Sequence, residues 1–539
     1  MVETLPGYRH RWLALLFTGI ALLVISMDNT ILNVALPAIA TDLDASASDL
    51  QWIVDAYVVV FAALLLTMGT ISDRIGRKRS LQFGLLWFAV GSLAAAVSNT
   101  TGMLIASRAF LGVGGALIMP STLSIISASF PQHERAQAFA IWAAIFGLGI
   151  GLGPVIGGGL LEHYDWGAVF LINLPIIAVA IPGGALYIAE SRDEHAPPLD
   201  LGGVVLSASG LFALVYGIIE AGEKGWTDDT VVFAFSLSFV LLATFARWES
   251  LNPHAMLPLR FFRNLSFTGA NIAMILITFS LFGALFFISQ FLQSVLGYSA
   301  FESGLRLLPL TLTVMATAAT SSRVAARFGT KLTVTMGVFM VGCALLWLSS
   351  ATIDTDYVPL ALNLVLLGLG IGLTMSPATN SIMQSVPVSK AGIGSAMNDT
   401  TRQVGGALGV AVLGTVMNNV YIDRIAGLKQ QLTAMPDEVF NVIESSIQAA
   451  HGVAHNLPAV LAQNSDVQLP ATLVESIQAS IVQTSNEAFV AGMSDALAVA
   501  AVVMFVASAL TFILLPAHVI PPQEEEPEDA RFEHSFMPQ

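Results

Sequence analysis

Charged residues and cysteine are scarce in this chain of 539 residues. Charged residues make up only 11% of the chain, against about 25% in an average soluble protein. So few charges could not cover the surface of a soluble protein of this length. Hydrophobic residues reach 55%, and the mean hydropathy is +0.74. These values exclude the soluble enzyme classes and predict a polytopic membrane protein.

Other absences exclude further functions. The chain has 22 Lys and Arg against 37 Asp and Glu, a net charge of −15, which argues against nucleic acid as a partner because nucleic acid requires basic patches. The single cysteine, Cys343, lies in an apolar run, so redox chemistry and thiolate metal sites are not expected. The sequence has no GxxxxGK[ST] or GxSxG motif, and His133-Glu134 lacks the second His of a zinc helix. We therefore expect no enzyme activity, no ATP-driven step, no metal and no cofactor.

Long apolar runs dominate the rest of the sequence. A bilayer core of about 30 Å requires about 20 apolar residues in each crossing helix. About fourteen such runs follow one another, so the fold expected is all-α with about fourteen transmembrane helices. The runs lie near 12–40, 51–72, 80–98, 101–128, 136–161, 167–189, 201–220, 230–248, 266–296, 304–322, 332–350, 357–379, 391–419 and 489–516. An even number of crossings would place both termini on one side.

The basic residues indicate which side that is. One side receives most of them: Arg9, Arg11, Arg74, Arg77, Lys78, Arg79, Arg135, Arg192, Arg247, Arg260, Arg263, Arg323, Arg327, Lys331, Lys390 and Arg531. The other side receives only Lys224, Arg306, Arg424 and Lys429. The positive-inside rule then predicts a multi-pass protein of the cell membrane with both termini in the cytoplasm.

A weak internal repeat suggests how the chain is divided. The loop after the second run contains Arg74-Ile-Gly76-Arg77-Lys78, and the loop after the tenth contains Arg327-Phe-Gly329-Thr330-Lys331. Two related six-helix bundles with two helices inserted between them would place the loops in this way. The predicted parts are an N-terminal bundle (1–189), two inserted helices with a cytoplasmic linker (190–265), five helices of the C-terminal bundle (266–420), an extracellular loop (421–488), the last transmembrane helix (489–516) and an acidic, disordered cytoplasmic tail (517–539). The extracellular loop is either a mobile cap or a lid over the exit path.

Four motifs connect the chain with a known family. They are Gly69-x-x-x-Asp73-Arg74-x-Gly76-Arg77-Lys78, Met27-Asp28-Asn29-Thr30-Ile-Leu-Asn33-Val34-Ala35-Leu36-Pro37, Trp166-x-x-x-Phe170-x-x-Asn173-x-Pro175 and Gly394-Ser395-x-x-Asn398-x-x-x-Arg402-x-x-Gly405-Gly406. Together they resemble the motifs of the major facilitator superfamily and of its fourteen-helix drug:proton antiporter branch, which includes multidrug and quaternary ammonium efflux pumps. The resemblance covers nearly the whole chain. It implies two six-helix bundles plus two inserted helices, and proton-coupled export.

The first of these motifs forms a loop between two predicted spans. Gly69 would allow two helices to approach closely, and Asp73 could meet a neighbouring helix N-terminus or Arg74. Arg77 and Lys78 would anchor the loop at the cytoplasmic face. The resemblance implies a conformational latch between the two halves; the alternative is that these basic residues only fix the topology.

A strip of glycines occupies the fifth predicted span. Gly149, Gly153 and Gly157 recur every four residues and therefore stack on one helix face. Such a strip allows close helix contact, and Pro154 permits a bend. The pattern Gly153-Pro154-x-x-Gly157-Gly158 resembles the antiporter motif of exporters, which implies outward transport. The alternative is generic tight packing.

Five ionisable residues inside spans are the candidates for proton coupling or substrate binding. Burying each one costs about 2.5–3.5 kcal/mol on insertion scales, so each requires a reason. Asp28, Asp55 and Arg108 fall in the outer half of the N-terminal bundle, where they could share one cavity. A carboxylate there could alternately hold a proton or a cationic substrate, or form a permanent structural pair with Arg108. Asp399 and Arg402, three residues apart on one helix, are either a local ion pair or a second proton or substrate site.

Two functions remain open, both of them transport. The first is a proton-coupled antiporter that exports lipophilic, cationic drugs such as quaternary ammonium compounds, dyes and biguanides. The second is a narrower exporter of one antibiotic, siderophore or metabolite. A receptor or membrane enzyme would require a signalling domain or catalytic cluster, and neither is found. The expected partners are the substrates, protons and the bilayer, with a monomeric chain. Aromatic and Met residues that could line an apolar cavity, or merely pack, are Trp142, Phe146, Phe282, Phe286, Phe287 and Met375.

Overall fold

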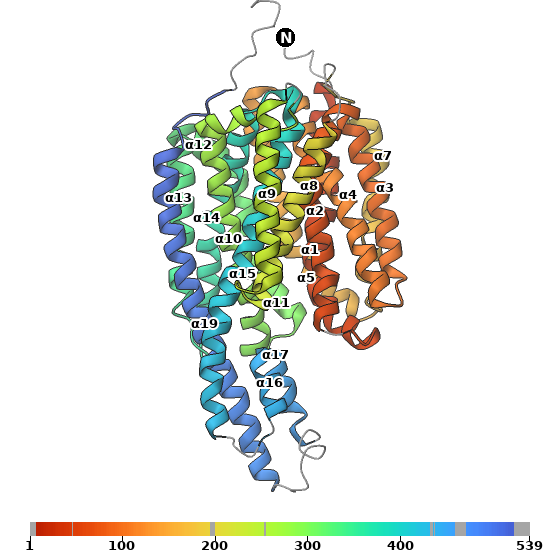
Figure 1. Ribbon diagram of the computed structural model, residues 1–539. Coiled ribbons are helices and arrows are strands. Elements are labelled where there is room, and N and C mark those ends of the chain that lie inside the picture. Colours follow the sequence, from red (N-terminus) through yellow and green to blue (C-terminus); the bar gives the residue numbers. More distant parts are fainter. Residues whose placement is uncertain are drawn as a thin grey trace, which may run out of the picture.

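The computed structural model describes residues 7–45, 47–193, 200–252, 255–431, 435, 437–458 and 470–521. All regular elements in these residues are helices, and most stand side by side in one bundle (Figure 1). Twelve described helices are long and apolar enough to cross a membrane. Two more helices of similar length, Arg77–Ala96 and Leu308–Phe328, lie in the same bundle and bring the number to the predicted fourteen.

The N-terminal half forms around two groups of helices. Its elements are η2 (Tyr8–His10), α1 (Arg11–Asp42), α2 (Ala47–Ile75), α3 (Arg77–Ala96), α4 (Thr101–Ser129), α5 (Gln132–Leu161), α6 (Ala168–Leu171) and α7 (Asn173–Tyr187). Helix α1 packs against α5 and α7, while α4 packs against α2 and α3. The start of α4 is fixed by Thr100, whose hydroxyl accepts a hydrogen bond from the main-chain N–H of Met103, the usual role of an N-cap threonine.

The two inserted helices are α8 (Leu201–Lys224) and α9 (Asp229–Leu251). Aspartates cap both of them: Asp200 accepts from the N–H of Gly203, and Asp228 accepts from the N–H of Thr230. Helix α8 contacts α2 of the N-terminal half and α15 (Ala391–Gln431) of the C-terminal half. It therefore lies along the boundary between the two halves.

The C-terminal half contains the two longest of the described helices. Its elements are η3 (Leu259–Arg263), α10 (Leu265–Gln290), η4 (Phe291–Val295, a π-helical turn), α11 (Ala300–Arg306), α12 (Leu308–Phe328), α13 (Thr330–Leu348), α14 (Tyr357–Gln384), η5 (Val388–Lys390), α15 (Ala391–Gln431), α16 (Asp437–Ser445), α17 (Ile447–His455) and α19 (Ala471–Leu514). Helix α10 packs against α15, α14 and α19, and α14 packs against α12 and α13.

The segment 421–488, predicted to be a loop, is helical over much of its described length. Helix α15 continues to Gln431, and α19 already begins at Ala471. Figure 1 shows these extensions, with α16 and α17, projecting from the end of the bundle opposite the N-terminus. Inside this projection the hydroxyl of Tyr421 donates to the carbonyl of Ile443 at 3.0 Å. Buried apolar side chains fill its centre, among them Ile425, Leu428, Phe440, Ile447, Ala450 and Ile481. The acidic residues of the predicted tail, Glu524 to Asp529, lie outside the described residues.

Candidate functional site

A fully buried ion pair joins α1 to α4. Nη1 of Arg108 lies 2.6 Å from Oδ2 of Asp28, and the two side chains are 1% and 0% exposed. Nε of Arg108 also donates to the main-chain carbonyl of Ile53 on α2 at 3.1 Å. The guanidinium therefore connects three helices. A charge-assisted bond of this length in a dry environment is among the stronger polar contacts in proteins.

The other oxygen of the same carboxylate is bonded as well. Nδ2 of Asn173 donates to Oδ1 of Asp28 at 3.0 Å and lies 3.2 Å from Oγ of Ser92. Aromatic rings cover the guanidinium of Arg108, with its Cζ 4.6 Å from the Tyr57 ring centre and 6.0 Å from that of Phe170. Asp28 thus has a partner on each oxygen, and the pair is shielded from the surroundings.

Asn173 and Phe170 were not singled out for a role from the sequence. They lie in the Trp166 motif, which entered only through its resemblance to a family. Phe170 and Asn173 are three residues apart, which places them on one side of the chain at the α6–α7 junction. This spacing could have suggested that both side chains contact the same group. Trp166 itself donates to Oδ2 of Asp42, at the end of α1, at 2.7 Å.

Asp55 lies on a different face of α2. Ile53 and Tyr57, which contact Arg108, are four residues apart and share one face. Asp55 is two residues from each, which turns it about 200° around the helix axis. One turn before it, Trp52 packs near Tyr216 of α8, with ring centres 5.9 Å apart. The structure brings together Asp28 and Arg108, whereas the half-buried Asp55 lies on another face of α2.

A second buried pair lies on α15 and is much looser. Nη1 of Arg402 is 3.8 Å from Oδ1 of Asp399, beyond hydrogen-bonding distance. Asn398 donates to that same oxygen at 3.1 Å. Within the described residues, Oδ2 of Asp399 and both Nη atoms of Arg402 have no hydrogen-bond partner. The guanidinium instead lies over two rings of α5, Phe146 and Trp142.

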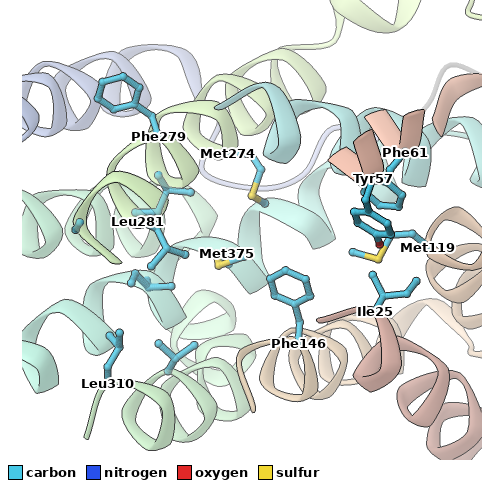
Figure 2. Packing of buried hydrophobic residues seen from close by; sticks show 14 of the residues in the cluster. Ile25, Tyr57, Phe61, Met119, Phe146, Met274, Phe279, Leu281, Leu310 and Met375 are labelled. Carbon is cyan, nitrogen blue, oxygen red and sulfur yellow. The ribbon is translucent and has the colours of Figure 1, made fainter. Parts of the chain in front are cut away.

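A small cavity of about 30 Å³ lies between the two halves. Its walls come from α5, α10, α12 and α14: Ala143, Phe146, Gly147, Ile150, Leu281, Leu285, Leu310, Thr311, Val314, Ile371 and Met375. Figure 2 shows Phe146 between Met375 on one side and Ile25 and Met119 on the other. The cavity has room for only about two water molecules. Of the predicted lining residues, Phe146 and Met375 reach it, whereas Phe286 is exposed on the outer surface.

The loop motif joins the halves at the N-terminal end of the bundle. Oδ2 of Asp73 accepts a hydrogen bond from the N–H of Gly392, in the first turn of α15, at 2.8 Å. Arg77 donates to Oδ1 of Asp73 at 2.7 Å and to the carbonyl of Val388 at 2.5 Å. A Cβ at Gly69 would lie 2.5 Å from the carbonyl oxygen of Gly392. Asp73 therefore lies at the N-terminus of α15 and pairs with Arg77. Arg74, the other partner that the sequence suggested, is exposed.

The segment after α7 holds this loop from the other side. Glu190 accepts from the main-chain N–H groups of Lys78 and Arg79 at 3.1 and 3.3 Å, and so covers the start of α3. Nζ of Lys78 donates to the carbonyl of Ala185 at 2.6 Å. Gly76 has a φ of 116°, and a Cβ there would lie 2.6 Å from the Glu190 carboxylate. Only glycine fits comfortably at this turn. The sequence alone did not indicate Glu190, because nothing near it in the chain shows its partner.

The glycine strip on α5 makes the close contacts that its spacing suggested. A Cβ at Gly149 would overlap the side chain of Ser26, and one at Gly153 would overlap Oγ1 of Thr30. A Cβ at Gly157 would lie 2.7 Å from Cγ1 of Ile31. All three glycines therefore face α1.

A different face of α5 contacts the C-terminal half. A Cβ at Gly158 would lie 3.3 Å from Cα of Phe301 on α11, and one at Gly304 would lie 3.3 Å from Cβ of Pro154. Helix α5 also packs against α12 and α14. With Asp73 at one end and α11 at the other, the two halves touch at both ends of the bundle, on either side of the small cavity.

The family model of the Major Facilitator Superfamily matches residues 18–410. The chain belongs to the major facilitator superfamily. A multidrug efflux pump, LfrA of Mycolicibacterium smegmatis, is 35% identical over 93% of this chain and 95% of its own length. The tetracenomycin C resistance and export protein of Streptomyces glaucescens is 33% identical over 97% of this chain and 95% of its own.

A solved structure agrees at the level of the fold. The proton:xylose symporter XylE aligns with a TM-score of 0.61 at 11% sequence identity, over 94% of this chain and 96% of XylE. This major facilitator protein is therefore a multi-pass efflux transporter of the cell membrane and not an enzyme, as its family and relatives show. The fold class and the family that the sequence suggested are both confirmed.

Proposed function

We propose that this protein is a proton-coupled antiporter that exports lipophilic cations, with Asp28 as the proton carrier. The observation that carries the proposal is the buried pair of Asp28 and Arg108, joined at 2.6 Å with both side chains 1% exposed or less. Placing ionisable side chains inside a membrane bundle costs free energy. Such a pair is therefore expected to serve transport or to stabilise the packing of the helices. Cationic substrates are favoured because membrane-embedded carboxylates attract positive charge.

The coupling step follows from the contacts of Asp28. When a proton binds to the carboxylate, the group becomes neutral and its attraction to Arg108 falls. When the proton leaves, the carboxylate forms the short ion pair again, with Asn173 on its other oxygen. Arg108 also bonds to Ile53 of α2, so a change in this pair is transmitted to three helices. One proton taken up outside and released inside would then accompany one outward movement of substrate.

The latch and the glycine strip would convert this local change into alternating access. Asp73 and Arg77 hold α2 against the start of α15, and breaking these contacts would open the N-terminal end of the bundle. The strip of Gly149, Gly153 and Gly157 would let α5 slide along α1, because α5 contributes no side chain at these three positions. We propose that the latch faces the cytoplasm, together with both termini, because the basic residues gather there.

A narrower exporter of one compound is the second candidate. It is supported by the tetracenomycin C resistance and export protein, a relative whose name states a single compound, and by the small volume of the cavity. The two candidates differ in their range of substrates. Efflux from a drug-sensitive host, measured across a panel of cations and neutral antibiotics, separates a broad spectrum from protection against one molecule.

The coupling proposal is tested in proteoliposomes with an imposed pH gradient and a fluorescent cationic dye. Asp28→Asn keeps the size and cannot ionise, so we expect pH-driven efflux to fall to the background. Asp28→Glu should retain part of it. Asp55→Asn is the matched control, because it removes a carboxylate from the same half but from another face, and we expect efflux to persist.

Two results would contradict this assignment. Full pH-driven efflux by Asp28→Asn would show that another group carries the proton. Recovery of efflux in the double variant Asp28→Asn with Arg108→Gln would show that Asp28 only balances a buried charge. Protein amounts are matched by in-gel fluorescence before each comparison.

A further inference from the structure

Arg402 occupies an aromatic surface that belongs to the other half of the protein. Its Cζ lies 3.8 Å from the ring centre of Phe146 and 5.3 Å from that of Trp142. These two rings are nearly parallel, at 8° with centres 6.1 Å apart. A cation over an aromatic face is attracted by the ring quadrupole, most strongly where water is excluded. The two rings therefore form a cation-binding surface, now filled by a side chain of the protein itself.

The guanidinium of Arg402 is poorly satisfied by hydrogen bonds. Neither Nη atom has a partner in the part of the chain that the structure describes, although the residue is only 4% exposed. The nearest carboxylate, Asp399, is 3.8 Å away, and its Oδ2 also lacks a hydrogen-bond partner among the described residues. Arg108, by contrast, bonds to Asp28 and Ile53. A buried charge without hydrogen bonds is costly, so Arg402 is held far less firmly than Arg108.

Phe146 connects this surface to the cavity between the halves. It lines the cavity together with Met375 of α14, and it also lies under the guanidinium of Arg402. Figure 2 shows its ring in the space between the two halves. A molecule that enters this cavity therefore contacts the ring of Phe146, which already lies against the guanidinium of Arg402.

We propose that Phe146, Trp142 and Asp399 form a binding site for lipophilic monovalent cations, and that Arg402 is a built-in competitor that fills the site when substrate is absent. An arriving cation displaces the guanidinium, lies against the two rings and is neutralised by the free oxygen of Asp399. The return of Arg402 then helps to release the substrate. The inference rests on the proposed function for the substrate class, and its site is separate from the Asp28–Arg108 pair.

The test measures equilibrium binding to purified, full-length protein in lipid nanodiscs. The probes are tetraphenylphosphonium and tetraphenylborate, which have the same shape and opposite charge, and calorimetry gives each Kd. For Arg402→Gln we expect the Kd of the cation to fall about tenfold, equivalent to about 1.4 kcal/mol, because a competing desolvated cation–π contact is removed. Arg402→Lys keeps a competing cation and should stay close to the parent protein.

Further variants identify the surface that the cation occupies. Adding Phe146→Leu to Arg402→Gln should abolish the gain. Adding Asp399→Asn to Arg402→Gln removes both charges of this pair, so no unpaired buried carboxylate is left at this site to disturb folding. The double variant should bind the cation more weakly than Arg402→Gln alone.

Different results separate this inference from the proposed function. An unchanged or larger cation Kd in Arg402→Gln would overturn the inference. Weaker binding of tetraphenylborate in the same variant would show that Arg402 receives anionic groups instead. That result would leave proton-coupled efflux by the parent protein untouched. If Asp28→Asn still couples to protons while the cation Kd falls in Arg402→Gln, the coupling proposal fails and the binding site stands.

Discussion

Replacing Gly153 on α5 would test whether the transport motion needs bare backbone against α1. A Cβ at this position would overlap Oγ1 of Thr30 and lie 3.0 Å from two main-chain atoms, the nitrogen of Ile31 and the oxygen of Met27. Thr30 can rotate, but the backbone of α1 cannot move without carrying the neighbouring Asp28 with it. We therefore expect Gly153→Leu to separate α1 from α5 and to disturb the buried ion pair.

The size of the effect can be estimated from the contact. Forcing extra carbon atoms into a closely packed site costs about 1–3 kcal/mol, and Leu adds four. Gly153→Ala adds one carbon, whose main clash is with the Thr30 hydroxyl. Among the described residues, the hydroxyl of Thr30 bonds only within its own helix, to the carbonyl groups of Ser26 and Met27. Thr30→Ala should therefore relieve much of the defect of Gly153→Ala while changing little by itself.

The assay combines thermal unfolding of the detergent-solubilised protein with dye efflux from cells that contain equal amounts of it. Gly159→Leu is the matched control, because a Cβ at Gly159 on the same helix has no heavy atom within 4 Å. We expect Gly153→Leu to unfold at a lower temperature and to lose most efflux, with Gly159→Leu near the parent. Normal stability and efflux in Gly153→Leu would refute a close contact at this position.

Two further predictions concern topology and the loop motif. In a Cys343→Ser background, a cysteine at Ser445 should react with a membrane-impermeant maleimide on intact cells, and one at Arg74 should react only after lysis; the reverse pattern would invert the orientation. Glu190→Gln keeps the shape of the side chain but removes the negative charge over the start of α3, so we expect lower efflux at unchanged protein amounts, and Glu190→Asp should rescue part of it. Full efflux by Glu190→Ala would mean that the loop motif holds its position without this carboxylate.

The sequence predicted the membrane fold and named the residues of both ion pairs, because long apolar runs and charges inside them are rare. A charge in an apolar span is costly, so Asp28 and Arg108 stand out from their surroundings. Glycine spacing of four residues likewise implies one helix face, and Gly153 lies on it. These inferences require only the chain itself and the period of a helix.

What the sequence could not give was how helices are rotated relative to one another. The sequence placed Asp55 and Asp28 in the same half of the N-terminal bundle, yet Asp55 lies on a different face of α2 from Ile53 and Tyr57, which contact Arg108. Asn173 is uncharged, and its importance depends on a bond to Asp28 far away in the chain. The segment 421–488 was too polar for the apolar-run criterion, which cannot detect helices that leave the membrane and pack on one another outside it.

A single helix, α15, connects three sites of the protein. It extends unbroken from Ala391 to Gln431, 41 residues, or about 60 Å at about 1.5 Å per residue. Its first turn is held by Asp73, Arg402 lies about three turns further along, and its far end packs into the helical projection with Tyr421. A rotation of about 10° around the held end would move the far end by about 10 Å. A small opening at the held end would therefore appear as a large displacement of the projection. A distance measured between labels on the projection and on the bundle would report that opening.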